Sequence, residues 1–466
     1  MITFDPKQLA EWTRGHWTVT PVSLFTGFTM DSRQLRTGQV FIALRTAQQD
    51  GHNFLPAALA AGASAAIVSR VNPELNLPQL LVPDPLVAFQ AIARRHRQAF
   101  RGRVIGISGS VGKTSTKNLL ALLLGGEAGG VLATEGNLNN HLGVPLTLTK
   151  LDHELHKFAV VEAGISGPGE MAPLALMIEP DLAIITLVSP AHVEALGTIE
   201  GVAKEKSVLP RAVKAGGVAV FPKQCEAFES FAELEVDRMV VERADVIRPE
   251  APPKGRVEYT ITHREGATAV ALAYGQPPPL IFTLRRVSDG MAQNAVLAIS
   301  AALRLGVTRT EIQARLGEWR AAAMRGELRE EAGKLLYVDC YNANPASMAD
   351  ALDAFYGMAP ANQPRLFVLG GMEELGAESA MFHRALGRSL RLRAEDHVFA
   401  IGDHAEALRE GALAAGVAAD QIEAVTSLEP MRARLADFAG AVFLKGSRRY
   451  QLESLLDPAV NPHAHA

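Results

Sequence analysis

The stretch VIGISGSVGKTSTKNLLALLL, residues 104–124, decides how the middle of this chain folds. Its apolar start predicts a buried strand, a glycine-rich turn follows, and the remainder has the spacing of an amphipathic helix. Glycines let such a turn direct backbone amides toward phosphate oxygens, while Lys113 supplies a cation and the helix N-terminus a favourable dipole. Thr114 offers a hydroxyl to Mg2+. The stretch therefore predicts a site for a nucleoside triphosphate.

The spacing of this turn differs from the usual phosphate-binding pattern GxxxxGK[ST]. Ile107 stands where the pattern has its first glycine, whereas Gly106, Gly109 and Gly112 are present. A plain tight turn is the structural alternative, but strand, turn and helix together favour phosphate binding. The turn alone does not decide whether the phosphate is transferred, hydrolysed to drive motion or used to activate a carboxylate.

Residues 99–318 form the predicted central P-loop ATPase domain around this turn. Consecutive apolar residues at 157–164 and 182–189 predict buried strands of a parallel sheet covered by helices. From about 220 to 290 the sequence alternates and is rich in turns, which predicts an antiparallel insertion or flank on the same domain.

The chain on either side predicts two more α/β domains. Residues 1–98 alternate short apolar runs with helical patterns, which is typical of a small α/β domain. Residues 319–466 contain four further apolar runs separated by helical stretches, and these predict a Rossmann-like, doubly wound sheet. The basic run RRHRQAFRGR, residues 94–103, marks the first boundary. We interpret it as a solvated helix end, with phosphate binding as the alternative.

The composition of the 466 residues excludes several classes of protein. With 46 Lys and Arg against 50 Asp and Glu, the net charge of -4 gives no global positive field for nucleic acid. Cys225 and Cys340 lie far apart, which argues against a disulfide framework and favours a reducing compartment. No signal peptide or membrane-spanning stretch is found, so a cytoplasmic protein is expected. The tail NPHAHA, residues 461–466, is expected to be a frayed terminus rather than a metal tract.

The turn SGSVGKTS at 108–115 resembles the variant turn TGTxGKT[ST] of the Mur ligase family. Further segments from Asp31 to Glu453 resemble the same family in the same order along the chain. They are DSRQLRTGQVFIAL (31–44), DGHNFLPAALAAGA (50–63), EGNLNNHLGVPLTL (135–148), VVEAGISGPGEM (160–171), SPAHVEALGTIEGVAKEKSVL (189–209), DCYNANPASM (339–348), GGMEELG (370–376) with His383, and LKGSRRYQLE (444–453). Within the family, these segments are most similar to the branch that adds D-alanyl-D-alanine.

The resemblance implies an ATP-dependent ligase of peptidoglycan precursor synthesis. Such an enzyme joins D-alanyl-D-alanine to the tripeptide carboxylate of UDP-N-acetylmuramoyl-tripeptide through an acyl phosphate. The implied cofactors are ATP and Mg2+, and the implied partners are these two substrates. No nucleic acid partner is expected, and the chain is expected to act as a monomer.

The resemblance also implies catalytic and metal-binding roles, with Lys113, Lys206, His192 and Arg325 at the catalytic positions. Thr114 and Glu162 would hold the Mg2+ that bridges the ATP phosphates, and His192 would bind a second metal ion. Lys206 matches the lysine that the family carbamylates with CO2, which makes it an anion able to bridge metals. From the residues alone, a capping carboxylate, a structural histidine and a surface lysine are the alternatives.

The implied ATP-binding residues come from the turn and from the junction of the second and third domains. They are Gly109, Ser110, Gly112, Lys113, Thr114, Ser115, Asn294, Arg325, Asp339, Tyr341 and Asn342. Two positions depart from the family. Gly290 and Met291 stand in the GxHNxxN pattern, which leaves the adenine contacts open, and Gly371 replaces an aspartate whose contacts Glu374 or His383 would take.

The implied substrate-binding residues lie in all three domains. They are Ser32, Arg33, Asp50, Gly51 and His52 for the UDP part, Asn137, Asn139 and Asn140 for the muramoyl peptide, and Asn344, Ser347, Lys445, Gly446, Ser447 and Arg448 for domain closure and the incoming dipeptide. Tight turns and a polar loop are the structural alternatives for the first two groups.

Two other functions remain open at this point. A sister ligase of the same family would add a different amine by the same mechanism. A nucleotide-binding regulator would keep the turn without ligating, although Glu162, His192 and Lys206 speak against it.

Overall fold

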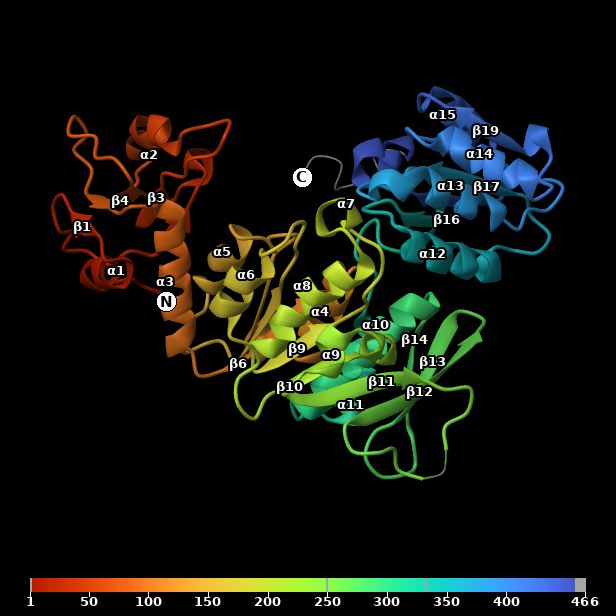
Figure 1. Cartoon of the computed structure of the whole chain (residues 1–466), viewed down its shortest axis with the longest axis horizontal. Helices are drawn as coiled ribbons and strands as arrows, with labels where there is room; N and C mark the ends of the chain where they lie inside the picture. The colour runs from red at the N-terminus through yellow and green to blue at the C-terminus, as the bar shows by residue number, and fades with distance from the viewer. Residues whose placement is uncertain (1, 249, 332, 457–466) are drawn as a thin grey trace.

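The computed structural model describes residues 2–248, 250–331 and 333–456, which form three α/β units with a separate sheet in each (Figure 1). This arrangement confirms the predicted fold class, whereas the domain boundaries at 98/99 and 318/319 stay predictions. The tail with His463 and His465 lies outside the described residues. None of the helices in the described part of the chain is long and apolar enough to cross a membrane.

The first unit contains a five-stranded sheet in the order β1-β5-β4-β3-β2, which is parallel except for β1. Its strands are β1 (His16–Trp17), β2 (Gly27–Thr29), β3 (Gln39–Ile42), β4 (Ala65–Val68) and β5 (Gln79–Leu81), and its helices are α1 (Pro6–Thr13), α2 (Leu55–Ala60) and α3 (Pro85–Ala99). Every residue of β4 is buried, because helices or loops cover both faces of the sheet there.

The central unit contains a nine-stranded sheet in the order β14-β13-β12-β11-β10-β9-β6-β8-β7. Its strands are β6 (Arg103–Ser108), β7 (Val131–Ala133), β8 (Phe158–Glu162), β9 (Leu182–Ile185), β10 (Val218–Pro222), β11 (Asp237–Arg243), β12 (Arg256–Arg264), β13 (Ala267–Ala273) and β14 (Leu280–Arg285). Its helices are α4 (Lys113–Leu123), α5 (Gly143–Leu148), α6 (Met171–Ile178), α7 (Val193–Leu196), α8 (Ile199–Arg211), α9 (Glu229–Ala232), α10 (Asp289–Arg304) and α11 (Arg309–Glu318).

The sheet of the central unit is parallel from β7 to β12 and antiparallel from β12 to β14. The predicted antiparallel flank is therefore confirmed for β12–β14 but wrong for β10 and β11. Strand β6 is apolar throughout because both of its faces are covered. Ile105 and Ile107 pack in one core with α4 and α10, whereas Val104 packs in the core on the opposite face with α5 and α6.

The third unit contains a six-stranded, doubly wound sheet in the order β15-β16-β20-β17-β18-β19. Its strands are β15 (Glu327–Glu331), β16 (Lys334–Asp339), β17 (Arg365–Gly370), β18 (His397–Ile401), β19 (Ile422–Val425) and β20 (Ala441–Lys445), and its helices are α12 (Pro345–Met358), α13 (Ser379–Arg388), α14 (Ala405–Ala414) and α15 (Glu429–Asp437). Only the edge strand β15 is antiparallel to its neighbour. Separate apolar cores on the two faces fix the sheet between its helices.

The basic end of α3 is buried between the first and central units, so the predicted solvated helix end is wrong for His96 and Arg97. The side chain of Arg97 is 0% exposed and donates to the carbonyls of Ile178 and Glu179 and to the Asp181 carboxylate, at 2.8, 2.7 and 3.2 Å. Burial lowers the pKa of His96 to about 4, so this ring is neutral near pH 7. Helix α3 therefore holds the two units together.

We expect Arg97→Ala to lower the free energy of unfolding by about 3–5 kcal/mol, because it leaves the Asp181 carboxylate and two helix-end carbonyls without their buried partner. Urea denaturation measures this loss. The matched control is Arg95→Ala, since Arg95 is exposed on the same helix and should change the unfolding free energy by less than about 0.5 kcal/mol. Equal effects of both substitutions would contradict the buried role of Arg97.

Candidate active site

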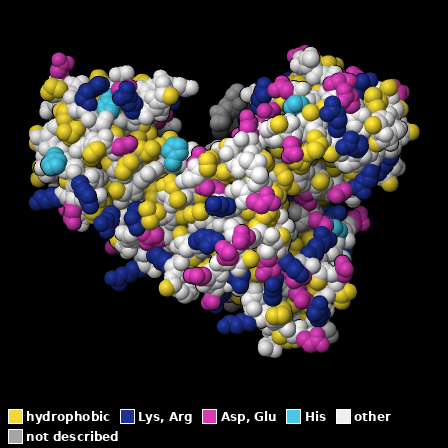
Figure 2. Space-filling model, viewed as in Figure 1, with side chains coloured by type: hydrophobic (Ala, Val, Ile, Leu, Met, Phe, Trp, Pro, Cys, Tyr) yellow, Lys and Arg dark blue, Asp and Glu magenta, His cyan; other side chains and the backbone are white. Residues whose placement is uncertain are grey.

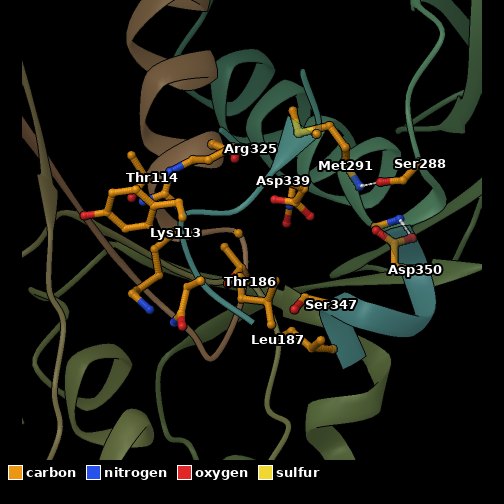
Figure 3. A pocket seen from close by; sticks show the side chains of 18 of the residues that line it. Lys113, Thr114, Thr186, Leu187, Ser288, Met291, Arg325, Asp339, Ser347 and Asp350 are labelled. Carbon is orange, nitrogen blue, oxygen red and sulfur yellow. Dashed lines mark hydrogen bonds between the residues drawn. The ribbon is translucent and has the colours of Figure 1, made fainter. Parts of the chain in front are cut away.

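A cavity of about 470 Å3 lies where the central unit meets the third unit (Figure 3). Its wall is built from the turn between β6 and α4, the start of α10, the end of β16 and the start of α12. The predicted site residues that line it are Ser110, Gly112, Lys113, Thr114, Ser115, Asn137, Asn139, Glu162, Asn294, Arg325, Asp339, Tyr341, Asn342, Asn344, Ser347 and Lys445. Most of the predicted nucleotide and phosphate positions are thus brought together.

The turn between β6 and α4 has no room for side chains at two of its glycines. Gly109 has a φ of 147°, and a Cβ there would overlap with the Thr186 hydroxyl. Gly112 has a φ of 85°, and a Cβ there would overlap with the Asn294 amide. Ser110 anchors the turn from the other side, because its hydroxyl donates to the Ser189 carbonyl at 2.9 Å. The turn therefore presents bare backbone to the cavity.

Helix α4 begins directly after this turn with no side chain capping its first N–H groups. These amides and the positive end of the helix dipole favour an anion at this end of the cavity. Lys113 Nζ donates to the Gly109 carbonyl at 2.8 Å, and burial lowers the pKa of Lys113, aided by Arg325 and opposed by Glu162. This arrangement is suited to phosphate oxygens.

Glu162 ends β8 beside the start of α4, and one of its carboxylate oxygens has no partner in the described part of the chain. Its Oε1 accepts from the Thr114 hydroxyl at 3.1 Å and from the Asn139 amide at 2.8 Å, whereas Oε2 is buried and has no hydrogen-bond partner among the described residues. Burying an unpaired acceptor is costly, which points to a missing ligand. A carboxylate and a hydroxyl are the oxygen donors that Mg2+ prefers, so the residues present fit this ion.

A magnesium ion here would have few protein ligands. No group of three or more His, Cys, Asp or Glu side chains that could hold a metal is found in the described parts of the chain. Mg2+ commonly binds through one or two protein oxygens, with phosphate and water completing its octahedron. The Thr114–Glu162 pair next to an anion site fits that pattern.

Lys206 on α8 is buried close to Lys113 without lining the cavity. Only 1% of Lys206 is exposed. Burial lowers the pKa of Lys206 well below its usual value, and the charge of Lys113 lowers it further. The neutral amine is the form that adds CO2. The carbamylation of Lys206 stays a prediction.

His192 lies at a contact between the central and third units and does not line the cavity. Its ring forms an ion pair with Glu374, and the backbone of both residues is left-handed, with φ of 55° and 61°. The pair lowers the pKa of Glu374. A role of His192 as a metal ligand stays a prediction, and it would require the ring to leave Glu374.

Two cations approach the cavity from the third unit. Lys445 ends β20 and its Nζ donates to the Asp339 carboxylate at 2.6 Å and to the Asn342 carbonyl at 3.2 Å. The Arg325 guanidinium stacks on the Tyr341 ring at 3.9 Å from its centroid. Both cations are held in fixed positions facing the central unit, which suits the neutralisation of phosphate.

Several predicted residues also have local structural roles. Asn344 and Ser347 form a capping box at the start of α12. The Asn140 carboxamide accepts the N–H groups of Leu142 and Gly143 at the start of α5. Away from the cavity lining, the Ser447 hydroxyl accepts the Glu373 N–H, and Arg448 pairs with Glu453. Their binding roles stay predictions.

The predicted UDP-binding residues lie in the first unit and do not line the cavity. The exposed Arg33 is bidentate to Asp31, next to Ser32. Asp50 and Gly51 begin a 3-10 turn whose His52 is buried, with Nδ1 2.6 Å from Asp50 and Nε2 accepting the Ser69 N–H. Figure 2 shows a deep notch between the first and third units. The UDP-binding role of these first-unit residues stays a prediction.

Gly371 stands where the family has an aspartate, and a tyrosine packs against it. A Cβ at Gly371 would lie 2.7 Å from the Tyr450 hydroxyl, which donates to Glu373 at 2.5 Å. His383 is buried with both ring nitrogens bonded to backbone, Nδ1 to Ser379 and Nε2 to the Met372 N–H. His383 therefore holds its own loop, and neither it nor Glu374 lines the cavity.

The cavity wall also contains several residues that the sequence did not predict. They are Val111, Thr186, Leu187, Val287, Ser288, Gln293, Trp319, Ala321, Gly326, Tyr337, Ala346 and Asp350, whereas Gly290 and Met291, which also line it, were named only as departures from the family pattern. Thr186 could have been found, because it directly follows the buried strand β9 at the edge where such sheets bind ligands. Asp350 lies inside a helical pattern and gave no signal.

Comparison with known proteins identifies relatives along the whole chain. Three family models match: "Mur ligase family, catalytic domain" over residues 24–108, "Mur ligase middle domain" over 107–245, and "Mur ligase, glutamate ligase domain" over 324–448. The UDP-N-acetylmuramoyl-tripeptide--D-alanyl-D-alanine ligase of Escherichia coli K12 is 30% identical over 459 residues, covering 98% of each chain.

Solved structures agree with these matches. A crystal structure of MurF from Acinetobacter baumannii has a TM-score of 0.85 and 29% identity, covering 97% of this chain and 98% of its own. MurF ligase from Thermotoga maritima, solved in complex with ADP, has a TM-score of 0.77 and 26% identity, covering 92% and 96%.

We expect Lys206→Met to raise the melting temperature of the nucleotide-free protein at pH 7, because methionine removes the cost of burying an ammonium. The pKa of Lys206 is lower in the folded than in the unfolded chain, so the unfolded chain binds more protons between the two values. Stability of the parent should therefore rise with pH, and the gap between the two proteins should narrow toward pH 10.

Thermal unfolding in CO2-free buffer from pH 7 to 10 measures this gap. Lys204→Met, at an exposed position of the same helix, is the control and should follow the parent. A lower melting temperature for Lys206→Met, or a gap independent of pH, would show that Lys206 is not a destabilising buried charge.

Proposed function

This chain belongs to the Mur ligase family, and on that premise we propose that it is the ATP-dependent ligase that joins D-alanyl-D-alanine to the tripeptide carboxylate of UDP-N-acetylmuramoyl-tripeptide in peptidoglycan synthesis. The observation that carries this proposal is the convergence in one cavity of the bare turn with Lys113, the Thr114–Glu162 pair, and Arg325 and Lys445 of the third unit. The full-length relatives with this activity in their names support it.

ATP would place its phosphates on the turn between β6 and α4. The uncapped start of α4, Lys113 and the helix dipole supply the positive potential there, and the Thermotoga maritima relative, solved in complex with ADP, supports a nucleotide as the ligand. Asn294, Arg325, Asp339, Tyr341 and Asn342 would hold the rest of the nucleotide. Mg2+, bound by Thr114 and Glu162, would supply neutralising charge to the phosphate oxygens.

The chemistry requires a carboxylate to become reactive. One oxygen of the tripeptide carboxylate would attack the γ-phosphorus of ATP, so that the bond to ADP breaks and an acyl phosphate forms. The amine of D-alanyl-D-alanine would then attack the carbonyl carbon, phosphate would leave, and the amine would lose a proton as the amide forms. The negatively charged phosphates and carboxylate would meet in the cavity. Lys113, Arg325 and Lys445 are the cations that would neutralise them.

The two organic substrates would reach the cavity from different sides. Asn137 and Asn139 already line it and would contact the muramoyl peptide, whose UDP part would bind the first unit across the notch. Ser447 and Arg448 follow β20, next to Lys445, and an arginine there could fix the dipeptide carboxylate bidentately. Closure of the units around the substrates would exclude water from the acyl phosphate.

We expect Lys113→Ala to reduce turnover by at least about 100-fold, because the transferred phosphoryl group loses its nearest cation. Release of phosphate in the presence of both substrates measures turnover. The control is Lys223→Met, which removes a lysine of the same unit that pairs with Glu242 away from the cavity and should retain full activity. Full activity of Lys113→Ala would reject the phosphate site.

Phosphate release and product mass together test the substrate assignment. With ATP, UDP-N-acetylmuramoyl-tripeptide and D-alanyl-D-alanine, one phosphate should appear per amide, and the product should carry two added alanines. Single amino acids in place of D-alanyl-D-alanine should give neither phosphate release nor amide product. A product with another amine added would identify a sister ligase, and slow ATP hydrolysis unchanged by either substrate would identify a nucleotide-binding regulator.

A further inference from the structure

The end of the cavity opposite Lys113 contains a carboxyl group that belongs to no motif. Asp350 lies on α12 in the third unit and faces the first residues of α10 in the central unit. Figure 3 shows Lys113 and Thr114 on one side of the cavity, and Ser288, Met291 and Asp350 on the other. With the phosphates held at Lys113, the nucleoside would extend toward Asp350.

The cavity has apolar walls suited to a flat ring, and Val287 and Met291 lie in sequence on either side of the Gly290 that contacts Asp350. Val287 and Trp319 line the cavity with only 8% and 5% of their surface exposed, and Met291 and Ala321 line it as well. The purine is the one large, flat and weakly polar part of a nucleoside triphosphate, so this end of the cavity fits the base.

Gly290 and Asp350 are in direct contact. The Gly290 N–H donates to Asp350 Oδ1 at 2.7 Å, and a Cβ on Gly290 would lie 2.5 Å from Oδ2. The carboxyl group therefore fills the space that a side chain at residue 290 would take. This explains why the GxHNxxN pattern is interrupted here, and it makes Asp350 the polar group at the place where that pattern has two polar side chains.

The other polar groups at the start of α10 are engaged elsewhere. Asp289 is bound by Arg243 and His263, each at 2.6 Å, and the Ser288 hydroxyl accepts the Met291 N–H at 3.1 Å. Asn294 lies against Gly112 at the phosphate end. Asp350 is thus an acceptor available to the base at this end of the cavity.

The Asp350 carboxyl group keeps capacity for a further donor. A carboxylate offers about four lone-pair positions, and the Gly290 N–H and the Ser288 side chain use only part of them. Burial raises the pKa of Asp350, and the negative charges of Asp339 and Asp289 raise it further. A donor from a ligand would relieve this cost.

We propose that Asp350 accepts a hydrogen bond from the exocyclic amino group of adenine, and that it makes this ligase selective for ATP over purine nucleotides without that group. The proposal rests on the proposed function, because ATP is taken as the ligand. The amino group is the only N–H donor on the base of ATP, so it is the base atom that can satisfy a carboxylate.

Calorimetric titration of the full-length protein with two nucleotides tests this contact. The probes are ATP and purine riboside triphosphate, in which hydrogen replaces the amino group. We expect the parent to bind ATP about 10- to 100-fold more tightly, the usual range for a hydrogen bond to a charged group. Asp350→Ala should bind both nucleotides alike, because only the affinity for ATP falls, and Asp350→Asn should keep part of the preference.

Matched controls separate this role from a purely structural one. Asp353→Ala removes an exposed carboxylate on the same helix and should keep the parent's preference. If Asp350→Ala weakens the binding of both nucleotides equally, Asp350 only caps α10 and the proposal is wrong. The proposal is also wrong if the parent protein binds both nucleotides equally well, a result that does not depend on any variant folding. It is likewise wrong if Asp350→Ala instead loses discrimination against 2′- or 3′-deoxy-ATP, because that loss would identify a ribose contact.

The outcomes also separate this proposal from the proposed function. Failure of the parent to bind ATP at all would overturn the ligase assignment, whereas tight ATP binding without a preference for the amino group would overturn only the role of Asp350.

Discussion

The backbone between β6 and α4 passes so close to Thr186 and Asn294 that Gly109 and Gly112 cannot carry side chains. The turn can take this path because β6 lies in the middle of a parallel sheet, with β9 on one side and α10 packed above it. What reaches the cavity is therefore a run of amides and the start of a helix, which together require an anion. The phosphate site and the metal site beside it both depend on this turn.

Charged groups that are costly in the free protein lie in the cavity or next to it. Lys206 is buried close to Lys113, one oxygen of Glu162 has no partner among the described residues, and Asp350 has acceptor capacity to spare. Each group comes from a different element. Glu162 and Asp350 line the cavity, whereas Lys206 is buried close to Lys113 outside its lining. Costly groups of this kind in and next to one cavity indicate that the free protein is less stable than it would be without them, because they serve binding.

The sequence predicts the parts of this structure that depend on local patterns. The glycine turn identifies β6 and α4, and unbroken apolar runs identify the parallel strands because both faces of each sheet are covered. Strand β15 was missed because its sequence, ELREE, is charged and it lies at an edge. Arg97 was misjudged because its acceptors, at residues 178–181, are distant in sequence. Asp350 could not be found for the same reason, since its partner Gly290 lies on another unit.

The fate of one oxygen atom tests the transfer of phosphate to a carboxylate most directly. The tripeptide carboxylate is labelled with oxygen-18, and the inorganic phosphate released during ligation is analysed by mass spectrometry. If the cavity activates the carboxylate as an acyl phosphate, one labelled oxygen should appear in phosphate for each amide formed from fully labelled substrate. Phosphate free of the label during active ligation would contradict this chemistry.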